Sequence, residues 1–281
     1  MLIAEPNAYI LYATLSKLPE LSNQEKVNST KLFMSEMNRL GVTAIMDAGG
    51  GFQNYPDDYG ITTKLCEENA LTVRMPYYLF AQKAGNELAD YTKWISSVEI
   101  GDGCDVPSDG AKRFGKMPKM EYHVQGGGEN LVMSAGDFEN FDKPRPELSP
   151  AMEGQLKAVL SLLIKNRWPF RIHATYNESI TRFLNVIEEI NQETPLDGLL
   201  WFFDHAETVS TENLQRIKTL QGGIAIQHRM AYQGENFIKR YGKKAAANTV
   251  PIKKMMEMGI KVGMGTDGTR VASYNPWVGL Y

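Results

Sequence analysis

The sequence predicts an α/β fold, a (β/α)8 TIM-type barrel, and three observations lead to that fold class. Short apolar runs typical of buried strands alternate with amphipathic helical patterns from Gly41 onward. The chain has 281 residues, against the roughly 250 that such a barrel needs. Three of the apolar runs end in His173, His205 and Asp267. Barrels of this kind keep their chemistry at the C-terminal ends of their strands.

Seven apolar runs predict seven strands, of which the run over 110–114 is the weakest. We expect parallel strands with right-handed crossovers, because helical patterns or long loops separate the runs. A closed barrel needs eight strands, so the predicted barrel is incomplete. The predicted strands cover 42–46, 71–80, 110–114, 170–174, 199–204, 223–227 and 260–264.

The helices are predicted from apolar stripes and from residues suited to helix ends. Val27, Phe33, Met37 and Leu40 form one stripe over about 24–40. Four later helices are expected to begin at residues that favour a helix N-terminus. The last of these helices is expected to end at a glycine. These residues are Ser149 with Pro150, Asn177, Ser210, and Pro251 with Gly259.

The domain organisation is predicted as one partial barrel over 1–281 that carries a long loop insertion at about 116–147. The insertion contains three consecutive glycines, Gly126 to Gly128, together with Pro144 and Pro146. Loops of this length inside a compact domain are usually functional or disordered. The chain begins without a ligand-bearing first strand and stops without a closing helix, which indicates an internal piece of a longer protein.

Composition excludes several classes of protein. The net charge of −3 and the absence of a long basic run argue against a nucleic-acid partner. No apolar stretch approaches about 18 residues, so no membrane partner is expected. Cys66 and Cys104 form no CxxC pair, so we expect no disulfide framework and place the protein in the cytoplasm. A homo-oligomer is left open.

His173, His205 and Asp267 together predict a divalent-metal site, with zinc as the leading metal. His173 and His205 lie 32 positions apart, about one strand–helix unit, and Asp267 follows 62 positions later, about two units. Two neutral imidazoles and a carboxylate are a suitable ligand set for zinc. Taken singly, each histidine is more often a hydrogen-bonded structural residue, and Asp267 before Gly268 suits a turn.

Three other residues are candidates for the site. Lys112, at the end of the weakest strand, could be a carboxylated lysine that bridges two metals, since an ammonium has no lone pair to offer. The alternative is a solvated lysine. His228 and Arg229 follow the strand predicted over 223–227 and could bind substrate, Arg229 through a substrate carboxylate. A surface loop is an equally good interpretation of His228.

A glycine pattern over 263–268 matches G-x-G-x-x-G after a strand. A dinucleotide-binding site would need this pattern in the first strand–helix–strand unit, with an acidic residue about 20 positions later. The chain ends too soon for that acidic residue. A nucleotide-binding α/β enzyme is therefore a minor alternative.

The chain resembles the amidohydrolase-3 branch of the amidohydrolase superfamily over nearly its whole length. Each matching motif alone is weak, but their order and spacing make the match specific. The motifs are Gly41-Val42-Thr43 with Asp47-Ala48-Gly49, Ile172-His173-Ala174, Asp204-His205-Ala206, Gln227-His228-Arg229-Met230, and Gly265-Thr266-Asp267 with Asn275-Pro276-Trp277.

The resemblance implies a metal-bearing (β/α)8 barrel beside a small β-sandwich. Its ligands would be a first-strand His-x-His, a carboxylated lysine or a glutamate on the fourth strand, histidines on the fifth and sixth, and an aspartate on the eighth. His173, His205 and Asp267 match the last three roles, and Lys112 is the candidate for the fourth strand. The sequence contains no His-x-His and no segments for the sandwich.

The implied function is hydrolysis of a non-peptide carbon–nitrogen bond, in an amide or cyclic amide, by metal-activated water. Asp267 would act as general base and then as general acid on a small-molecule substrate. Because the first-strand ligands are missing, we expect this chain alone to bind metal weakly and to be inactive. A second hypothesis is a non-catalytic binding or regulatory protein on the same scaffold, in which Asp267 pairs with a basic side chain.

Overall fold

The computed structural model of the chain describes residues 14–15, 17–49, 53–101, 103–104, 122–138, 141, 144–268 and 272–281. Within these residues, six strands form a parallel sheet in the order β1-β3-β4-β5-β6-β7. A short β2 pairs antiparallel with β3. The strands are β1 (Tyr77–Leu79), β2 (Gly103–Cys104), β3 (Tyr122–Gly127), β4 (Phe170–Ala174), β5 (Trp201–His205), β6 (Gly223–Gln227) and β7 (Lys261–Gly265).

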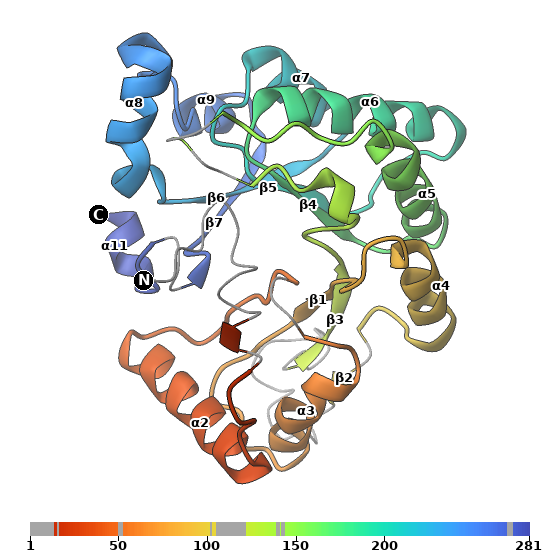
Figure 1. Cartoon of the computed structure of the whole chain (residues 1–281), viewed down its shortest axis with the longest axis vertical. Helices are drawn as coiled ribbons and strands as arrows, with labels where there is room; N and C mark the ends of the chain where they lie inside the picture. The colour runs from red at the N-terminus through yellow and green to blue at the C-terminus, as the bar shows by residue number, and fades with distance from the viewer. Residues whose placement is uncertain are drawn as a thin grey trace.

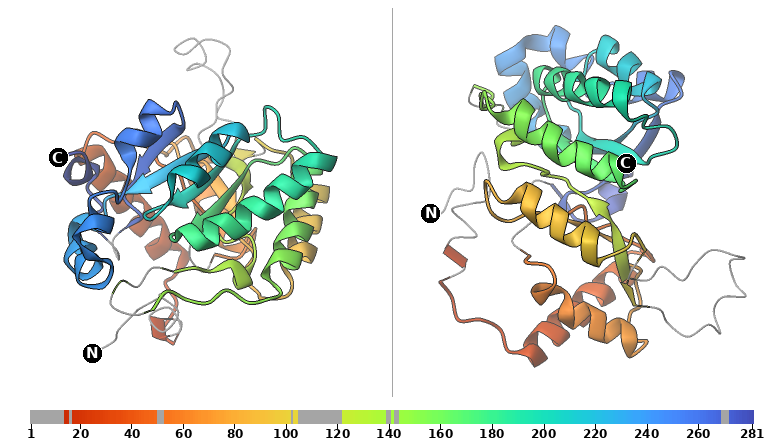
Figure 2. Two further views of the ribbon diagram at one scale, coloured as in Figure 1. Left: turned by 90° about the horizontal axis from the view of Figure 1, so that it is seen from above. Right: turned by 90° about the vertical axis from the view of Figure 1, so that its right-hand side faces the viewer.

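Helices α4, α5, α6 and α7 lie along the outer side of the curved sheet, which confirms the predicted partial TIM-type barrel (Figures 1 and 2). Helices α4, α5, α6 and α7 pack side by side in chain order along the outside. The described helices are α2 (Asn23–Arg39), α3 (Gly60–Glu67), α4 (Glu87–Ser97), α5 (Met152–Lys165), α6 (Asn177–Glu193), α7 (Thr211–Thr219), α8 (Met230–Ala246), α9 (Ile252–Glu257) and α11 (Pro276–Leu280), with 3-10 turns at Asp57–Tyr59 and Met133–Ala135.

The strands that carry the predicted site agree best with the sequence. Strands β4 and β6 have the predicted bounds, and β5 and β7 differ from theirs by only one or two residues at an end. The run over 42–46 contributes only isolated bridges, Ala44 to Arg74 and Asp47 to Tyr77. The predicted strand over 110–114 lies outside the described residues.

Strand β3 lies inside the range that was predicted as a loop insertion. Five of its six residues are buried, although His123, Gln125 and two glycines make it a poor strand by composition. The glycines are needed for close packing, because a Cβ at Gly126 would lie 2.1 Å from the backbone oxygen of Pro169. Of the rest of 116–147, the stretches 116–121, 139–140 and 142–143 lie outside the described residues.

The helix ends follow the predicted capping chemistry with small shifts. The Ser210 hydroxyl accepts a hydrogen bond from the backbone N–H of Asn213 and caps α7, as predicted. Helix α5 begins at Met152 rather than at Pro150, since Ser149 instead accepts from the N–H of Ala151 in a turn. Helix α9 is followed by Gly259 with a φ of 73°, as predicted for a C-terminal glycine.

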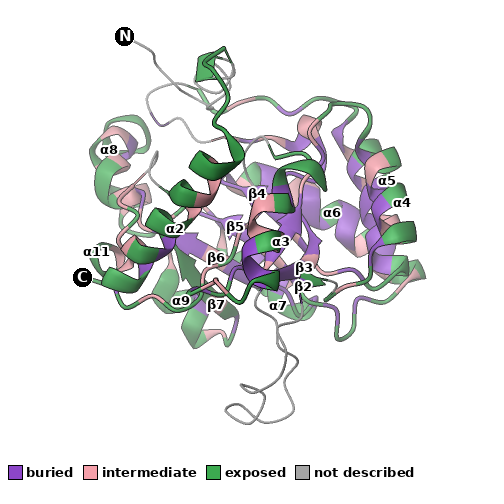
Figure 3. Ribbon diagram, turned by 90° about the horizontal axis from the view of Figure 1, so that it is seen from below, coloured by how far each residue is buried: buried purple, intermediate pink, exposed green. Residues whose placement is uncertain are grey.

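The core lies between the sheet and its outer helices, and the central strands are its most buried part (Figure 3). Phe170 stacks against Trp201 on the neighbouring strand, and the Trp201 indole N–H donates to the backbone oxygen of Leu220. Buried apolar residues of α5, α6 and α7 belong to the same core cluster as these rings. Because the apolar side chains are buried on the helix-covered outer side of the sheet, its inner side is available for polar groups.

Cys66 and Cys104 form a disulfide that joins α3 to β2, with their Cα atoms 5.9 Å apart. The expectation of no disulfide framework was therefore wrong for this pair. The two cysteines are 38 positions apart in the sequence and share no local motif. Only the pairing of β2 with β3 and the packing of α3 beside them bring the two sulfurs together.

Two hydrogen bonds connect segments near opposite ends of the described chain. The Trp277 indole N–H donates to the backbone oxygen of Leu40 at 2.8 Å, and the Tyr274 hydroxyl donates to Glu36 at 2.7 Å. The segment after β7 therefore packs against the C-terminal end of α2 and links the two edges of the open sheet.

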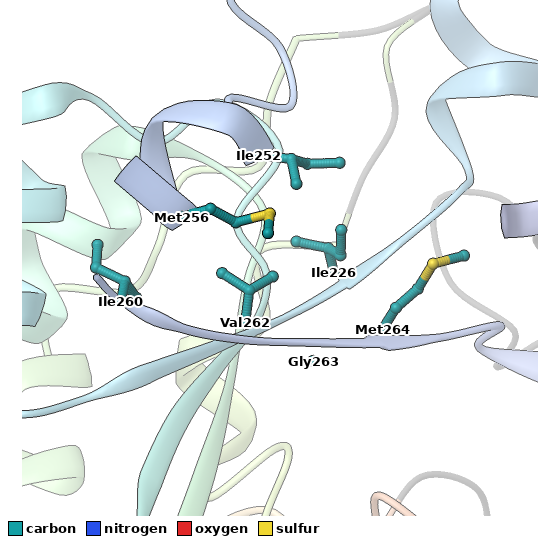
Figure 4. A pocket seen from close by; sticks show the side chains of 7 residues that line it. All are labelled: Ile226, Ile252, Met256, Ile260, Val262, Gly263 and Met264. Carbon is teal, nitrogen blue, oxygen red and sulfur yellow. The ribbon is translucent and has the colours of Figure 1, made fainter. Parts of the chain in front are cut away.

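An apolar groove of about 390 Å³ lies between α9 and the sheet edge at β7 (Figure 4). Ile252 and Met256 of α9 line it together with Ile226, Val262 and Met264 of the sheet. Neighbouring residues of a strand point to opposite faces, and Gln227, next to Ile226, hydrogen-bonds to His205 on the inner side. The groove is therefore on the outer face and offers no polar group for catalysis.

Among the helices of the described residues, none combines the length and the apolar character needed to cross a bilayer.

We expect Gly126→Ala to destabilise the fold and Gly154→Ala to stabilise it. An added Cβ at Gly126 meets backbone, so β3 and β4 must separate, at a cost of about 1–3 kcal/mol. Gly154 is an exposed helical glycine with open space around it, where alanine should contribute about 0.5–1 kcal/mol. Denaturant unfolding of both variants measures the two shifts. Equal shifts would contradict the close packing of β3 on β4.

Candidate metal centre

Three metal-capable side chains converge at the C-terminal ends of three adjacent strands. Glu129 follows β3, His173 lies in β4 and His205 ends β5. One candidate ligand atom from each lies within 4.8 Å of the other two. Both histidines are buried and Glu129 is partly buried. The group is thus a compact, largely desolvated set of one carboxylate and two imidazoles.

The backbone at the end of β5 lets His205 meet His173. In the parallel register, His173 pairs with Asp204 and shares its face, so regular alternation would send His205 to the opposite face. His205 and Ala206 instead have φ values of 78° and 52°. This left-handed conformation is uncommon for residues other than glycine, and it redirects the chain so that the two imidazole centroids lie 4.3 Å apart.

Glu129 is positioned by glycine and by a backbone hydrogen bond. Gly128 has a φ of 138°, and a Cβ there would lie 2.5 Å from the backbone oxygen of Arg171. The chain after β3 can therefore pass close to β4. The N–H of His173 then donates to the backbone oxygen of Glu129 at 3.0 Å, which anchors the carboxylate beside the imidazoles.

The spacing of the group suits a tetrahedral metal such as zinc. Glu129 Oε1 lies 3.6 Å from His173 Nδ1, and Glu129 Oε2 lies 3.3 Å from His205 Nε2. Two tetrahedral ligands at about 2.0–2.1 Å from zinc are themselves about 3.3 Å apart. The two contacts of Glu129 are therefore close to the spacing that one zinc ion requires, and the three donors lie within 4.8 Å of one another.

The electrostatics of the group without a metal favour a carboxylate and protonated imidazoles. Burial would raise the pKa of Glu129, but His173 and His205 outweigh it and hold that pKa well below its usual range. Burial would lower the pKa of His205, but the hydrogen bond and charge of Glu129 raise it to about 10. A metal ion must therefore displace protons when it binds.

Asp137 lies behind His173 and is fully buried. Its carboxylate accepts from the N–H groups of Thr175 at 2.9 Å and Tyr176 at 3.0 Å. One of its oxygens lies 3.5 Å from His173 Nε2. A carboxylate behind a histidine is the usual support for a metal-binding imidazole, since it leaves the other nitrogen, here Nδ1, to face the metal.

Asp204 precedes His205 but belongs to a different interaction. Arg171 Nε donates to Asp204 at 2.9 Å, and the same guanidinium lies 5.2 Å from the centre of the Tyr78 ring. Arg171 lies on β4 two residues before His173, and Asp204 lies on the neighbouring β5 one residue before His205. This ion pair engages the Asp204 carboxylate, so Glu129 is the acidic member of the three-residue group.

The other predicted site residues are placed differently. Asp267 follows β7, is exposed and has a φ of 55°. It is not in the three-residue group, although its charge contributes to the raised pKa of His205. His228 follows β6 and is covered by α11, since a Cβ on Gly279 would lie 2.9 Å from its Nδ1. Lys112 lies outside the described residues.

Arg229 is directed into the protein rather than toward a substrate. Its side chain is 2% exposed and donates to the buried carboxylate of Glu207. A clamp on a substrate carboxylate would require an accessible guanidinium. In this structure Arg229 is instead buried and pairs with Glu207, at the position where the sequence interpretation placed a substrate contact.

Sequence reasoning missed Glu129 because the segment around it has the composition of a loop. Its only local signal is that it follows the glycine triplet at the end of a short run, 122–127, that contains Tyr122 and Val124. The family resemblance allowed a glutamate on the fourth strand, which is the position that β3 occupies when β4 and β5 are taken as the fifth and sixth.

Comparison with known proteins gives one family. A family model described as "Amidohydrolase family" matches residues 1–281. No match was found among curated proteins.

Solved structures share the fold at low sequence identity. An uncharacterized metal-dependent hydrolase from Pyrococcus furiosus is 17% identical with a TM-score of 0.66, over 96% of this chain and 52% of the other. Guanine deaminase from C. acetobutylicum is 11% identical, with a TM-score of 0.52 over 92% and 54%. An atrazine chlorohydrolase mutant from Arthrobacter aurescens, complexed with zinc and atraton, is 11% identical, with a TM-score of 0.53 over 91% and 51%. The chain spans about half the length of these proteins.

We expect the metal-free chain to lose stability as the pH rises from about 7 to about 9. The pKa of His205 is raised from 6.5 to about 10 in the fold. The stabilisation from its bound proton is therefore complete below about pH 6.5 and is lost as the pH approaches about 10. Urea unfolding in the presence of a chelator measures the slope.

His205→Gln should reduce that slope, whereas His123→Gln, which lies outside the three-residue group, should leave it unchanged. A slope that is the same in the wild-type chain and in His205→Gln would show that His205 does not hold its proton in the folded state.

Proposed function

The chain belongs to the amidohydrolase family, and on that premise we propose that it builds most of the active site of a metal-dependent hydrolase for non-peptide carbon–nitrogen bonds. The observation that carries the proposal is the buried convergence of Glu129, His173 and His205 at the C-terminal ends of adjacent parallel strands. The substrate would be a small-molecule amide or cyclic amide.

Glu129, His173 and His205 would hold one divalent metal, with zinc preferred because two imidazoles and a carboxylate suit it. Glu129 takes the fourth-strand role for which Lys112 was considered. When bound, the ion would supply Lewis-acid activation of water and of the scissile carbonyl. Asp137 supports His173 from behind and fixes the nitrogen that it presents.

Asp267 would be the proton-transfer residue. It follows the last strand at the same end of the sheet as His205, and it is exposed toward solvent where a substrate can approach. Its carboxylate would accept the proton of the attacking water and then deliver it to the leaving nitrogen. His228, which follows β6 at the same end of the sheet, stays the candidate for a substrate contact.

Two observations favour this function over the alternatives. A non-catalytic scaffold was expected to pair Asp267 with a basic side chain, and no such ion pair exists among the residues the structure describes. A nucleotide site was expected to use the glycines over 263–268, but Gly263 and Gly265 lie within β7 itself rather than in a turn that leads to a helix.

The whole activity is proposed for a protein of about twice this length, because the chain covers about half of each solved structure reported above. The sequence has no His-x-His to add to the three ligands. We therefore expect this chain by itself to bind zinc weakly and to hydrolyse no amide at a measurable rate.

Zinc titration by calorimetry tests the ligand assignment. Glu129→Gln should weaken zinc binding by at least tenfold, because an amide oxygen replaces an anionic ligand. Lys112→Met should leave the affinity unchanged if Glu129, and not a carboxylated lysine, serves the fourth strand. Glu67→Gln, an exposed glutamate on α3, is the matched control.

Equal affinity in the wild-type chain and in Glu129→Gln would overturn the proposed site. Loss of zinc only in Lys112→Met would restore the lysine as the fourth-strand ligand. Tight stoichiometric zinc in the wild-type chain would contradict the expectation of weak binding and would call for assays of amide hydrolysis with this chain alone.

A further inference from the structure

A row of buried polar side chains extends from His205 away from the three-residue group. Gln227 contacts His205 Nδ1 at 2.8 Å, and the guanidinium of Arg229 contacts the same end of the Gln227 amide. Glu207 accepts from Arg229 at the far end. All four side chains are buried, with exposed fractions of 6% or less. None of Glu207, Gln227 and Arg229 belongs to the metal-capable group.

The donor and acceptor chemistry of this row allows one orientation of the Gln227 amide. A guanidinium has only N–H donors and keeps its charge at all relevant pH values. The amide oxygen must therefore face Arg229, where it accepts from the guanidinium at 3.0 and 3.2 Å. The same oxygen lies 2.8 Å from His205 Nδ1. Because an oxygen cannot donate, Nδ1 of His205 must carry a proton.

The proton on Nδ1 determines which nitrogen of His205 is available to a ligand. In a neutral imidazole one nitrogen donates and the other carries the lone pair. In the metal-free imidazolium both nitrogens carry protons, and Nε2 faces Glu129 at 3.3 Å. When a metal displaces one proton and Nδ1 keeps the other, the lone pair is on Nε2. The opposite tautomer would direct an N–H into the group and could not bind a metal there.

We propose that Gln227, oriented by the Arg229–Glu207 ion pair, is a positioning residue that fixes the Nδ1–H tautomer of His205 and so presents Nε2 to the metal. This inference rests on the proposed metal centre and extends it to residues beneath the site. It also gives Arg229 a role: the guanidinium orients the amide and does not touch the substrate.

The buried ion pair suits this role because it leaves the amide one orientation. Without Arg229, the Gln227 amide could turn its NH₂ group toward His205 and stabilise the wrong tautomer. Without Glu207, the Arg229 charge would lose its buried counterion, at a large cost in stability. His173 is supported by the carboxylate of Asp137 and His205 by a neutral amide, so only one of the two imidazoles has an anionic support.

The test combines zinc calorimetry with ¹⁵N NMR of the histidine rings in the whole chain. The chain has four histidines, so each ring can be assigned by substitution. In the wild-type chain, His205 should show a slowly exchanging Nδ1–H with or without zinc. Added zinc should shift the Nε2 resonance of His205 and leave Nδ1 protonated.

Gln227→Leu removes the acceptor oxygen with little change in volume. Gln227→Glu keeps an acceptor, because both oxygens of an ionised carboxylate accept hydrogen bonds and neither donates. We expect Gln227→Leu to lose the slow Nδ1–H signal and to bind zinc roughly 10-fold to 100-fold more weakly. Gln227→Glu should retain both the signal and most of the affinity. Gln215→Leu, an exposed glutamine on α7, is the matched control, and backbone amide spectra verify that each variant is folded.

Wild-type zinc affinity in Gln227→Leu, or zinc bound to Nδ1 of His205 in the wild-type chain, would overturn the inference. Absence of zinc binding in every variant would instead overturn the proposed function. In that case the Nδ1–H signal still tests the hydrogen bond from His205 to Gln227. A slow signal in the wild-type chain that is lost in Gln227→Leu supports this hydrogen bond, and absence of the signal in the wild-type chain refutes it.

Discussion

The structure depends most on holding one carboxylate and two imidazoles together inside a region that excludes water. Each of these groups is costly to bury alone, because a low-dielectric interior disfavours its charged form. Glu129 offsets that cost because its negative charge lies close to both imidazolium rings. Its oxygens are 3.6 Å from His173 Nδ1 and 3.3 Å from His205 Nε2. The same three donors would exchange protons for a divalent ion, so the arrangement that stabilises the metal-free fold is also the arrangement that a metal requires.

The surrounding backbone is shaped to bring these groups to one point. Gly126 and Gly128 let β3 approach β4 more closely than any side chain would permit, and this approach carries Glu129 to the site. The left-handed conformation at His205 turns its ring toward His173 although the register would separate them. Such conformations persist where surrounding packing enforces them, and they cluster at functional sites. Behind the rings, Asp137 and Gln227 engage the nitrogens that face away from Glu129.

Much of the fold was predictable because strands β4 to β7 are short, apolar and bounded by helices with clear caps. His173 and His205 were found for the same reason, since each ends such a run. Glu129, Asp137 and β3 were not, because glycines and polar residues around them have the composition of a loop. The Cys66–Cys104 disulfide was missed because its partners are brought together by β2 and α3 and by no local motif. Arg229 was assigned to substrate, whereas its neighbours in space, Glu207 and Gln227, engage it in the interior.

The sequence by itself determined the α/β class, the strand ends that carry imidazoles and the resemblance to a family of metal-dependent hydrolases. These properties follow from local periodicity and from the residue at the end of each run, which need no knowledge of distant contacts. Only the tertiary structure decided which carboxylate joins the histidines and which nitrogen of His205 is free to bind. Both depend on distances between residues far apart in the chain, and on whether a buried neighbour can donate or only accept a hydrogen bond.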